Sequence, residues 1–370
     1  MEKKSLKSFY KFDFTLLFIV ILLLLIGLMF VYSSSYAWAE YKYDDAFFYV
    51  KRQLLFVSLG IVGMVCIAFI PYYVWRSYVY YIFAFCLLLT IAVLIPNIGI
   101  VRGGAQSWIG IGAFSIQPSE FIKLGLIFLL SHLLTKNRRT IKTFFKGFFT
   151  PIVIIFFVFG LIMLQPDFGT GVVLVCTSVL LVFIAGARII YFVYLAMIGA
   201  VGFTFLIISA PYRISRIHSF LNPWNDPLGD GFQIIQSLYA VGPGKLFGVG
   251  FTNSIQKYFY LPEPQTDFIF AIISEEFGFV GGAFVLVLFS LLAYRGTLIA
   301  LNIPDLFGRF AAFGIVAMIT IQAFINISVV IGLIPVTGIT LPFLSYGGSS
   351  LTLTLCSVGV LINISSYAKY

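Results

Sequence analysis

The chain has 370 residues, of which 61% are hydrophobic and only 10% are charged. Soluble domains carry about 25% charged residues, so the composition excludes an ordinary soluble domain and indicates a membrane protein. The net charge of +9 follows membrane topology, and no nucleic acid partner is expected. Isolated cysteines without a Cys-x-x-Cys pair or Cys/His cluster speak against a disulfide framework and a zinc site.

Long apolar runs predict an all-α polytopic membrane protein with about ten transmembrane helices, because a spanning helix needs about 20 apolar residues. Basic residues concentrate in short loops on one side, as in KNRRTIKTFFK (136–146). That side is expected to be cytoplasmic, together with both termini. Residues 1–370 are expected to form a single membrane domain. The expected spans are 14–32, 53–70, 78–95, 120–134, 150–165, 170–186, 189–209, 268–294, 308–333 and 342–365.

The loops on the outer side carry most of the remaining information. Residues 33–52 are expected to form a polar, aromatic loop, and residues 96–119 a glycine-rich loop. Residues 210–266 form a large extracytoplasmic loop between the seventh and eighth helices, and loops of this length are usually functional or disordered. Within it, residues 231–241 have the apolar spacing of a helix and are expected to lie along the membrane surface.

Three carboxylates stand in the stretch KYFYLPEPQTDFIFAIISEEFGFVGG (257–282), where an apolar run begins. Charges at or below a membrane surface are costly, and function is their usual explanation. Asp267 has two interpretations: a helix cap, or a carboxylate that accepts a proton from a substrate hydroxyl. Glu275 and Glu276 lie deeper and point to different faces of a helix. At least one of them is expected to face the protein interior or a water-filled cavity, paired with a base.

Further candidates lie on the other outer segments. Asp167, in QPDFGT (165–170), is interpreted first as part of a tight turn. Lys123 follows Glu120 by three residues. It either forms a local ion pair with Glu120 or is a base that faces an anionic headgroup. Trp108 is either an interfacial aromatic anchor or a platform for a sugar face.

Basic residues in the large outer loop oppose the general inside bias, which suits an anionic lipid headgroup. The sequence GPGKLFGVG (242–250) lacks the pattern of a phosphate-binding loop, so a nucleotide site is rejected. Residues 335–350 interrupt an apolar stretch and form either a plain turn or the floor of a central cavity. Gly278-x-x-x-Gly282 is a candidate helix-packing motif. The basic residues of interest in the loop are Arg213, Arg216, Lys245 and Lys257.

Five motifs, in this order and spacing, resemble the SEDS family of shape, elongation, division and sporulation proteins. The resemblance is strongest to the sporulation member of the family, and the division member is close behind. It covers almost the whole chain. The motifs are GAQSWIGIGAFSIQPSEF (104–121), QPDFGT (165–170), LNPWNDPLGDGFQIIQSLYAVGPG (221–244), YLPEPQTDFIFAIISEE (260–276) and GLIPVTGITLPFLSYGGSS (332–350).

The resemblance implies a peptidoglycan glycosyltransferase of the bacterial cytoplasmic membrane that polymerises lipid II at the outer face and releases undecaprenyl pyrophosphate. It implies ten transmembrane helices and a class B penicillin-binding protein as partner. The family's essential Asp falls on Asp267, its essential Trp on Trp108 and a family Glu on Glu120. Many relatives have Arg just before this Trp. Here Gln106 and Ser107 precede it, so that role is absent or belongs to Arg102.

The implied chemistry assigns roles to the candidates. Asp267 is expected to be the catalytic base. Lys123 and the loop residues Arg213, Arg216, Lys245 and Lys257 are expected to hold the pyrophosphates, together with a divalent cation, Mg²⁺ or Mn²⁺, whose ligands the sequence does not identify. Asp167, Glu275 and Glu276 are expected to be structural or coupling residues.

Two other functions fit part of the pattern. A lipid II flippase would also use broken helices and intramembrane carboxylates, but no clear inverted repeat is visible and the relevant bases lie on one side. A non-catalytic scaffold that recruits the transpeptidase is the other alternative.

Overall fold

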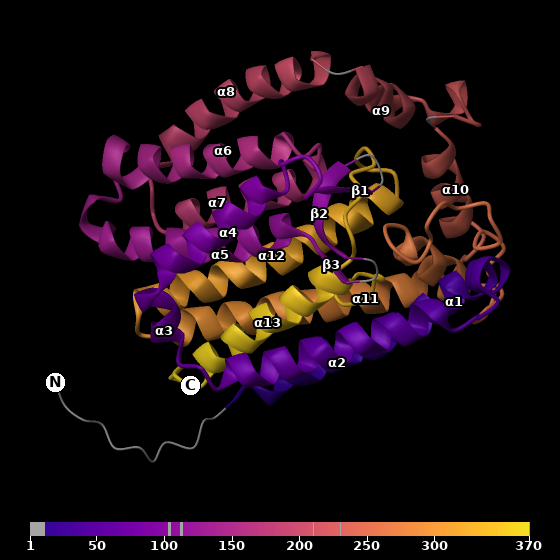
Figure 1. The fold of residues 1–370 in the computed structure, drawn as a ribbon, viewed down its shortest axis with the longest axis horizontal. Helices are drawn as coiled ribbons and strands as arrows, with labels where there is room; N and C mark the ends of the chain where they lie inside the picture. Colours follow the sequence, from indigo (N-terminus) through magenta and orange to yellow (C-terminus); the bar gives the residue numbers. More distant parts are fainter. Residues whose placement is uncertain (1–11, 103–104, 112–113, 210, 230, 370) are drawn as a thin grey trace.

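Long helices run along one common direction in the computed structural model, which describes residues 12–102, 105–111, 114–209, 211–229 and 231–369 (Figure 1). The main helices of the first half are α1 (Phe14–Tyr43), α2 (Phe48–Ala68), α3 (Tyr72–Ser77), α4 (Val79–Ala92), α5 (Pro118–Lys136), α6 (Thr150–Met163) and α7 (Phe168–Ile184). The second half contains α8 (Ile189–Ile208), α9 (Pro211–Leu221), α10 (Phe232–Val241), α11 (Ile269–Asn302), α12 (Leu306–Val330) and α13 (Gly348–Ser365). Short elements are the strands β1 (Ile100–Arg102), β2 (Ala105–Ile111) and β3 (Phe114–Ile116), the 3₁₀ helices η1 (Arg138–Thr140) and η3 (Pro223–Asn225), and the π-helix η2 (Phe144–Phe149).

Each of the ten apolar runs coincides with a helix, which confirms a polytopic helical protein. Among the described residues, seven helices are long and apolar enough to cross a membrane. The other three of the expected ten, α4, α7 and α8, have shorter apolar stretches and do not meet this standard. The number ten therefore stays a prediction.

The two ends of the described chain lie on the same side of the bundle, opposite the sheet and the large loop (Figure 1). The Asp13 amide donates to Ser365 Oγ at 3.1 Å, and Asp13 Oδ2 pairs with Arg295 Nε at 2.9 Å. These contacts join the start of α1 to α13 and α11. One side of the bundle thus carries both ends, as the distribution of basic residues predicts.

Helix α1 is longer than expected. It continues beyond the predicted span to Tyr43 and ends where Asp44 adopts a left-handed conformation, with φ 51°. Ser34 and Ser35 interrupt the hydrophobic run, but their hydroxyls donate to the carbonyls of Phe30 and Val31 inside the helix, each at 2.6 Å. Polar side chains satisfied in this way do not end a helix, so the expected loop over residues 33–52 is wrong for most of its length.

The glycine-rich outer segment is a small sheet and not the expected irregular loop. Strand β2 lies in the middle, antiparallel to β1 and β3, and pairs Trp108 with Ile100. The side chain of Gln106 donates to the Val93 carbonyl at 3.0 Å and fastens the sheet to the end of α4. Gln117, directly after β3, donates its amide to Ser349 Oγ at 3.3 Å. The sheet is thereby held between the outer ends of α4 and α13.

Helix α12 lies in the interior of the bundle, and most of its residues are buried. It packs against α5, α7 and α11, and α13 lies along α2. Helix α8 differs: apart from its first turns, which pack through Tyr191 and Phe192 against Phe148, most of its described side chains are exposed. An apolar helix with an exposed surface of this kind suits contact with lipid.

Helix α11 is broken. Gly278 has φ 64° and ψ −157° inside it, so the carbonyls and amides around the break lose their partners within the helix. Residues 245–250 replace these partners: Val249 and Gly250 donate to the carbonyls of Glu275 and Glu276, each at 3.0 Å. In the other direction, Phe279 and Val280 donate to the carbonyls of residues 245 and 246, at 2.8 and 3.1 Å. In the motif Gly278-x-x-x-Gly282, the first glycine therefore contacts the backbone of a loop and not another helix, so the expected helix-packing contact is wrong at Gly278.

The glycines of residues 242–250 permit this close approach. A Cβ at Gly278 would stand 2.5 Å from the Gly248 amide nitrogen and 2.6 Å from the Gly244 carbonyl oxygen. Backbone meets backbone here, and only glycine leaves enough room. The glycine spacing that resembles a phosphate-binding loop is explained by this packing.

A second irregular segment, residues 331–347, enters the bundle before α13. Its side chains Leu341, Phe343 and Leu344 are at most 2% exposed. The predicted last span therefore begins later, at Gly348, and the plain-turn interpretation is wrong. Helix α10 forms as expected over residues 232–241, but its Ser237 hydroxyl donates to the Val330 carbonyl at 2.7 Å, so one face packs on the bundle.

Candidate functional site

Asp267 lies two residues before the first residue of α11 and is partly exposed. The N-cap of this helix is Phe268, which makes no side-chain cap hydrogen bond, so Asp267 stands one residue before the N-cap position. A Cβ on Gly338 would lie 3.7 Å from Asp267 Oδ2. The carboxylate thus sits against the irregular segment 331–347, at the outer end of the bundle.

Three hydrogen bonds hold the backbone around Asp267. Asn326 Nδ2 donates to the Asp267 carbonyl at 2.8 Å, Ser345 Oγ to the Thr266 carbonyl at 2.5 Å, and the Tyr346 amide to the Gln265 carbonyl at 2.8 Å. Three consecutive carbonyls are therefore fixed by α12 and by the segment before α13. Such a frame pre-organises the carboxylate, as catalysis by a fixed group requires.

Two amides on α12 hold the irregular segment in place. Asn326 Nδ2 also donates to the Ile339 carbonyl at 2.7 Å, and Gln322 Nε2 donates to the Thr340 carbonyl at 3.0 Å. The two side chains are four residues apart and lie on one face of the helix. They satisfy backbone carbonyls that would otherwise be buried without partners, which is the condition for non-helical backbone within a membrane bundle.

A buried polar network lies next to this segment. Lys123 Nζ is 2.9 Å from Glu120 Oε1 and donates to Gln322 Oε1 at 2.9 Å. Ser350 Oγ donates to Glu120 Oε2 at 3.3 Å and lies 3.4 Å from Thr340 Oγ1. Glu120 and Lys123 are 8% and 3% exposed. The local ion pair that the sequence suggested exists, and it connects α5, α12 and α13.

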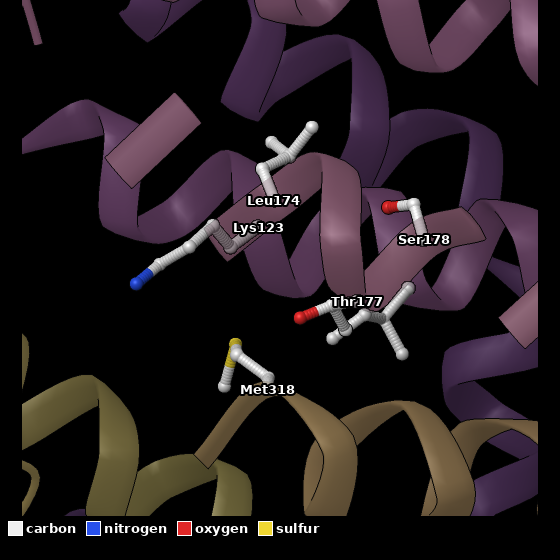
Figure 2. A pocket seen from close by; sticks show the side chains of 6 residues that line it. Lys123, Leu174, Thr177, Ser178 and Met318 are labelled. Atoms are coloured by element: carbon white, nitrogen blue, oxygen red, sulfur yellow. The ribbon is translucent and has the colours of Figure 1, made fainter. Parts of the chain in front are cut away.

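A small pocket lies beside Lys123. Figure 2 shows the Lys123 side chain at its edge, with the ammonium pointing away from Leu174, Thr177 and Ser178, which also line the pocket. Among the described residues, Thr177 Oγ1 is buried without a hydrogen-bond partner. The ammonium itself is directed to Glu120 and Gln322.

Asp167 caps α7 and joins it to the start of α5. Its Oδ1 accepts from the Thr170 amide at 3.2 Å, and its Oδ2 accepts from Gln117 Nε2 at 2.9 Å and Ser119 Oγ at 3.1 Å. Ser119 is adjacent to Glu120, so Asp167 fixes the helix start that carries the ion pair. These contacts exceed those of an ordinary turn and fit the expected structural role.

Glu275 and Glu276 bind the same short stretch of the large loop. Glu276 Oε1 lies 2.9 Å from Lys257 Nζ, and both side chains are fully buried. Glu275 accepts from Ser254 Oγ at 2.5 Å and from the Ile255 amide at 2.8 Å. One of the two glutamates faces the interior and pairs with a base, as expected. Lys257, expected at the pyrophosphates, is instead enclosed with its carboxylate partner.

The remaining candidates lie on other parts of the chain. Lys245 is exposed, at the break of α11. Trp108 is partly buried in the central strand β2. Arg213 and Arg216 lie on α9, and their side chains fall outside the described ones.

Metal-binding groups are sparse. In the described part of the chain, no three His, Cys, Asp or Glu side chains gather in a way that could hold a metal ion. A cation that is held only by protein side chains therefore has no prepared site among these residues. A Mg²⁺ ion usually takes one or two carboxylates and completes its shell with substrate phosphates and water.

Several site residues were not predicted from the sequence: Gln322 and Asn326, which fix the irregular segment, and Ser33, Ser345 and Ser350. The two amides had a visible signal, because polar side chains four residues apart in an apolar helix are costly and call for partners. The serines had none, because single serines are common in membrane helices.

Among the described residues, seven helices long and apolar enough to cross a membrane define an integral membrane protein. Its helical bundle holds a buried ion-pair network and the fixed backbone around Asp267. The sequence profile of the FTSW_RODA_SPOVE family of cell cycle proteins matches residues 14–370. The chain belongs to this family, which is the SEDS family of the resemblance.

Relatives agree over nearly the full length. Stage V sporulation protein E of Bacillus subtilis (strain 168) is 59% identical over 358 residues, which cover 97% of this chain and 98% of that protein. A probable peptidoglycan glycosyltransferase FtsW of Geobacter sp. (strain M18) is 40% identical over 355 residues, which cover 96% of this chain and 97% of that protein.

Solved structures show the same fold. A chain from a peptidoglycan synthase complex, described for its coordination of polymerization and crosslinking, superposes with a TM-score of 0.77 at 30% identity, covering 96% of this chain and 98% of that one. The rod shape determining protein RodA of Thermus thermophilus gives a TM-score of 0.69 at 25% identity, covering 96% and 97%.

Proposed function

We propose that this protein is a peptidoglycan glycosyltransferase that polymerises lipid II at the outer face of the bacterial cytoplasmic membrane. The observation that carries this proposal is the frame around Asp267, in which three consecutive carbonyls are fixed by Asn326, Ser345 and Tyr346. Membership of a family that includes proteins named as probable peptidoglycan glycosyltransferases supports it.

The reaction is a single displacement. The acceptor hydroxyl oxygen attacks the anomeric carbon of the donor sugar, and the bond from that carbon to the pyrophosphate oxygen breaks. The proton of the hydroxyl passes to the Asp267 carboxylate, and undecaprenyl pyrophosphate leaves with its electron pair. A pyrophosphate needs no acid to leave, so one base and stabilisation of the phosphate charge suffice.

The bases divide into two groups by their surroundings. Lys123 and Lys257 are engaged in buried ion pairs, whereas Lys245 is exposed at the outer end. We assign pyrophosphate contact first to Lys245 and to Arg213 and Arg216 of α9. Lys123 borders the small pocket and stabilises charge from within the bundle. A Mg²⁺ or Mn²⁺ ion, when bound, would neutralise phosphate charge and complete its shell with substrate phosphates and water.

The partner we propose is a class B penicillin-binding protein, which crosslinks the glycan that this chain makes. The similarity to a chain of a peptidoglycan synthase complex supports this assignment. The similarity to stage V sporulation protein E supports a place at the sporulation septum or forespore membrane.

The test is polymerisation of labelled lipid II by purified protein in detergent, with and without the partner. Asp267→Asn is expected to lower the rate by about 100- to 10,000-fold, the usual contribution of a general base. Asp44→Asn is the matched control: this exposed aspartate ends α1, and Asn tolerates its left-handed conformation. The control should retain the wild-type rate.

Two outcomes would reject the proposal. Wild-type protein that moves lipid II across vesicle membranes but forms no polymer in detergent would indicate a flippase. Unchanged polymerisation by well-folded Asp267→Asn would remove the base assignment. A scaffold predicts that this variant still supports sporulation as long as the partner localises.

A further inference from the structure

We propose that Lys257 and Glu276 form a positioning pair. Their contact, which we call the latch, joins the two ends of residues 257–276, and Asp267 lies near the middle of this stretch. This inference rests on the proposed role of Asp267 as the base. The ammonium and the carboxylate are 2.9 Å apart, and 19 positions separate the two residues in the sequence.

The latch is enclosed. Both side chains have no exposed surface, and Ser33 of α1 donates to Glu276 Oε1 at 2.6 Å. Lys257 also lies over the ring of Tyr36, with Nζ 4.9 Å from its centroid. The latch therefore joins three separate parts of the chain: α1, the large loop and the first half of α11.

The same loop turn is fixed a second time. Glu275, on a different face of α11, accepts from the Ser254 hydroxyl and from the amides of Ile255 and Gln256. Neighbouring carboxylates on one half-helix thus hold residues 254–257 from two sides. The backbone bonds between residues 245–250 and the break at Gly278 add a third attachment.

Geometry connects this latch to the base. The half-helix between Asp267 and the break has only about two and a half turns, at about 3.6 residues per turn. A half-helix this short, broken at one end, is not anchored by the rest of α11. Its direction is set by the packing of its buried side chains and by the loop that fills the break. The latch closes the loop at its base, while Asn326, Ser345 and Tyr346 hold it at its tip.

Stability alone gives no reason for an ion pair at this place. Replacing a buried pair by well-packed apolar residues is often neutral or stabilising, whereas removal of one partner leaves an uncompensated charge. Among the described residues, the second oxygen of Glu276 has no hydrogen-bond partner, so its charge depends on Lys257. Unlike apolar packing, the pair orients the loop and the half-helix through directed hydrogen bonds, which Glu276 accepts from Ser33 and from the Ser254 amide.

The experiment separates positioning from stability with three variants: Lys257→Met, Glu276→Leu and the two combined. Thermal unfolding, the kcat and KM of lipid II polymerisation, and amide hydrogen exchange of residues 258–268 are measured for each. Lys51→Met is the matched control, because it breaks an exposed pair with Asp45 by the same substitution. It should change none of these quantities appreciably.

Each single variant is expected to lose about 10- to 100-fold in kcat, the effect of a base displaced by a fraction of an ångström to 1 Å, with little change in KM. Faster exchange over residues 258–268 should accompany the loss. The combined variant should regain the unfolding temperature of the wild type but keep a kcat at least about tenfold low, because the directed bonds are still missing.

Recovery of kcat together with the unfolding temperature in the combined variant would overturn the proposal, since the pair would then act on stability alone. A raised KM at unchanged kcat in Lys257→Met would also overturn it and return Lys257 to the substrate. If single variants fail to insert, the combined variant and Glu276→Gln, which keeps an acceptor without the charge, supply the same comparison.

The exchange measurement does not depend on chemistry. If Asp267→Asn polymerised normally, the proposed function would fail, but faster exchange of residues 258–268 in the latch variants would still show that the latch holds this loop. Unchanged exchange in these variants would overturn the latch whatever the activity of Asp267.

Discussion

At the scale of single residues, the position of Asp267 depends on the backbone beside it. Gly338 has φ +72° and is the residue whose absent Cβ would come within 3.7 Å of Asp267 Oδ2. An alanine there has space but lies in a left-handed conformation, which costs an L-residue about 1–2 kcal/mol. The segment would relax by changing its backbone angles, and the carbonyls bound by Gln322 and Asn326 would move with it.

Gly338→Ala is therefore expected to lower kcat several-fold and the free energy of unfolding by about 1–2 kcal/mol. Gly332→Ala is a close control, because Gly332 also has φ +72° but faces Leu238. Both variants should lose similar stability in thermal unfolding, and only Gly338→Ala should lose activity. Wild-type activity of Gly338→Ala would show that the backbone at residue 338 does not control the position of Asp267.

At the scale of elements, the break in α11 is the feature that most distinguishes this bundle from a set of straight helices. Gly278 combines φ 64° and ψ −157°, a region open essentially to glycine. A Cβ would also meet the backbone of Gly244 and Gly248. Strain and collision therefore act together at one position.

Gly278→Ala is expected to cost about 3 kcal/mol or more, the sum of backbone strain and displacement of the packed loop. Gly160→Ala in α6 is the control, because nothing lies within 4 Å of its Cβ position and alanine favours a helix by about 0.5–1 kcal/mol. Thermal unfolding in detergent measures both. A stability of Gly278→Ala equal to that of Gly160→Ala would contradict the strain and close packing at the break.

The helices of this fold were predictable, and the departures from helices were not. A hydrophobic run reports that backbone groups must be satisfied within the segment, so all ten apolar runs appear as helices. It does not report where a distant segment supplies the bonds instead. The break at Gly278 depends on residues 245–250, which are about 30 positions away, and a local pattern of two glycines gives no sign of that partner.

The candidate site divides in the same way. Glu120 and Lys123 are three residues apart on one helix, so their ion pair was foreseeable from spacing. The pair of Lys257 and Glu276 joins a loop to a helix across 19 positions, and nothing in the spacing selects Lys257 among the bases of the loop. Only the burial seen in the structure distinguishes Lys257, which is enclosed in an ion pair, from Lys245, which is exposed and available to a substrate.

At the scale of the whole molecule, both ends of the described chain lie opposite the sheet and the large loop (Figure 1). The short basic loop between α5 and α6 lies at the same end of the bundle as the two termini (Figure 1). Because lysine and arginine accumulate in cytoplasmic loops, this end is expected to be inside. The Asp267 site then faces the outer side, where the sugars of lipid II are polymerised in the proposed reaction.

Cysteine labelling in intact cells tests this orientation. Cys66, Cys86, Cys176 and Cys356 are first replaced by serine, and single cysteines are introduced as Leu228→Cys or Arg139→Cys, both at exposed positions. A membrane-impermeant maleimide should label position 228 in intact cells and position 139 only after permeabilisation, because the reagent cannot cross the hydrocarbon core. Labelling of position 139 from outside would invert the bundle, place Asp267 in the cytoplasm and remove it from an outer polymerisation site. Such a result would contradict the charge argument and the proposed reaction together, since both require the same side of the membrane.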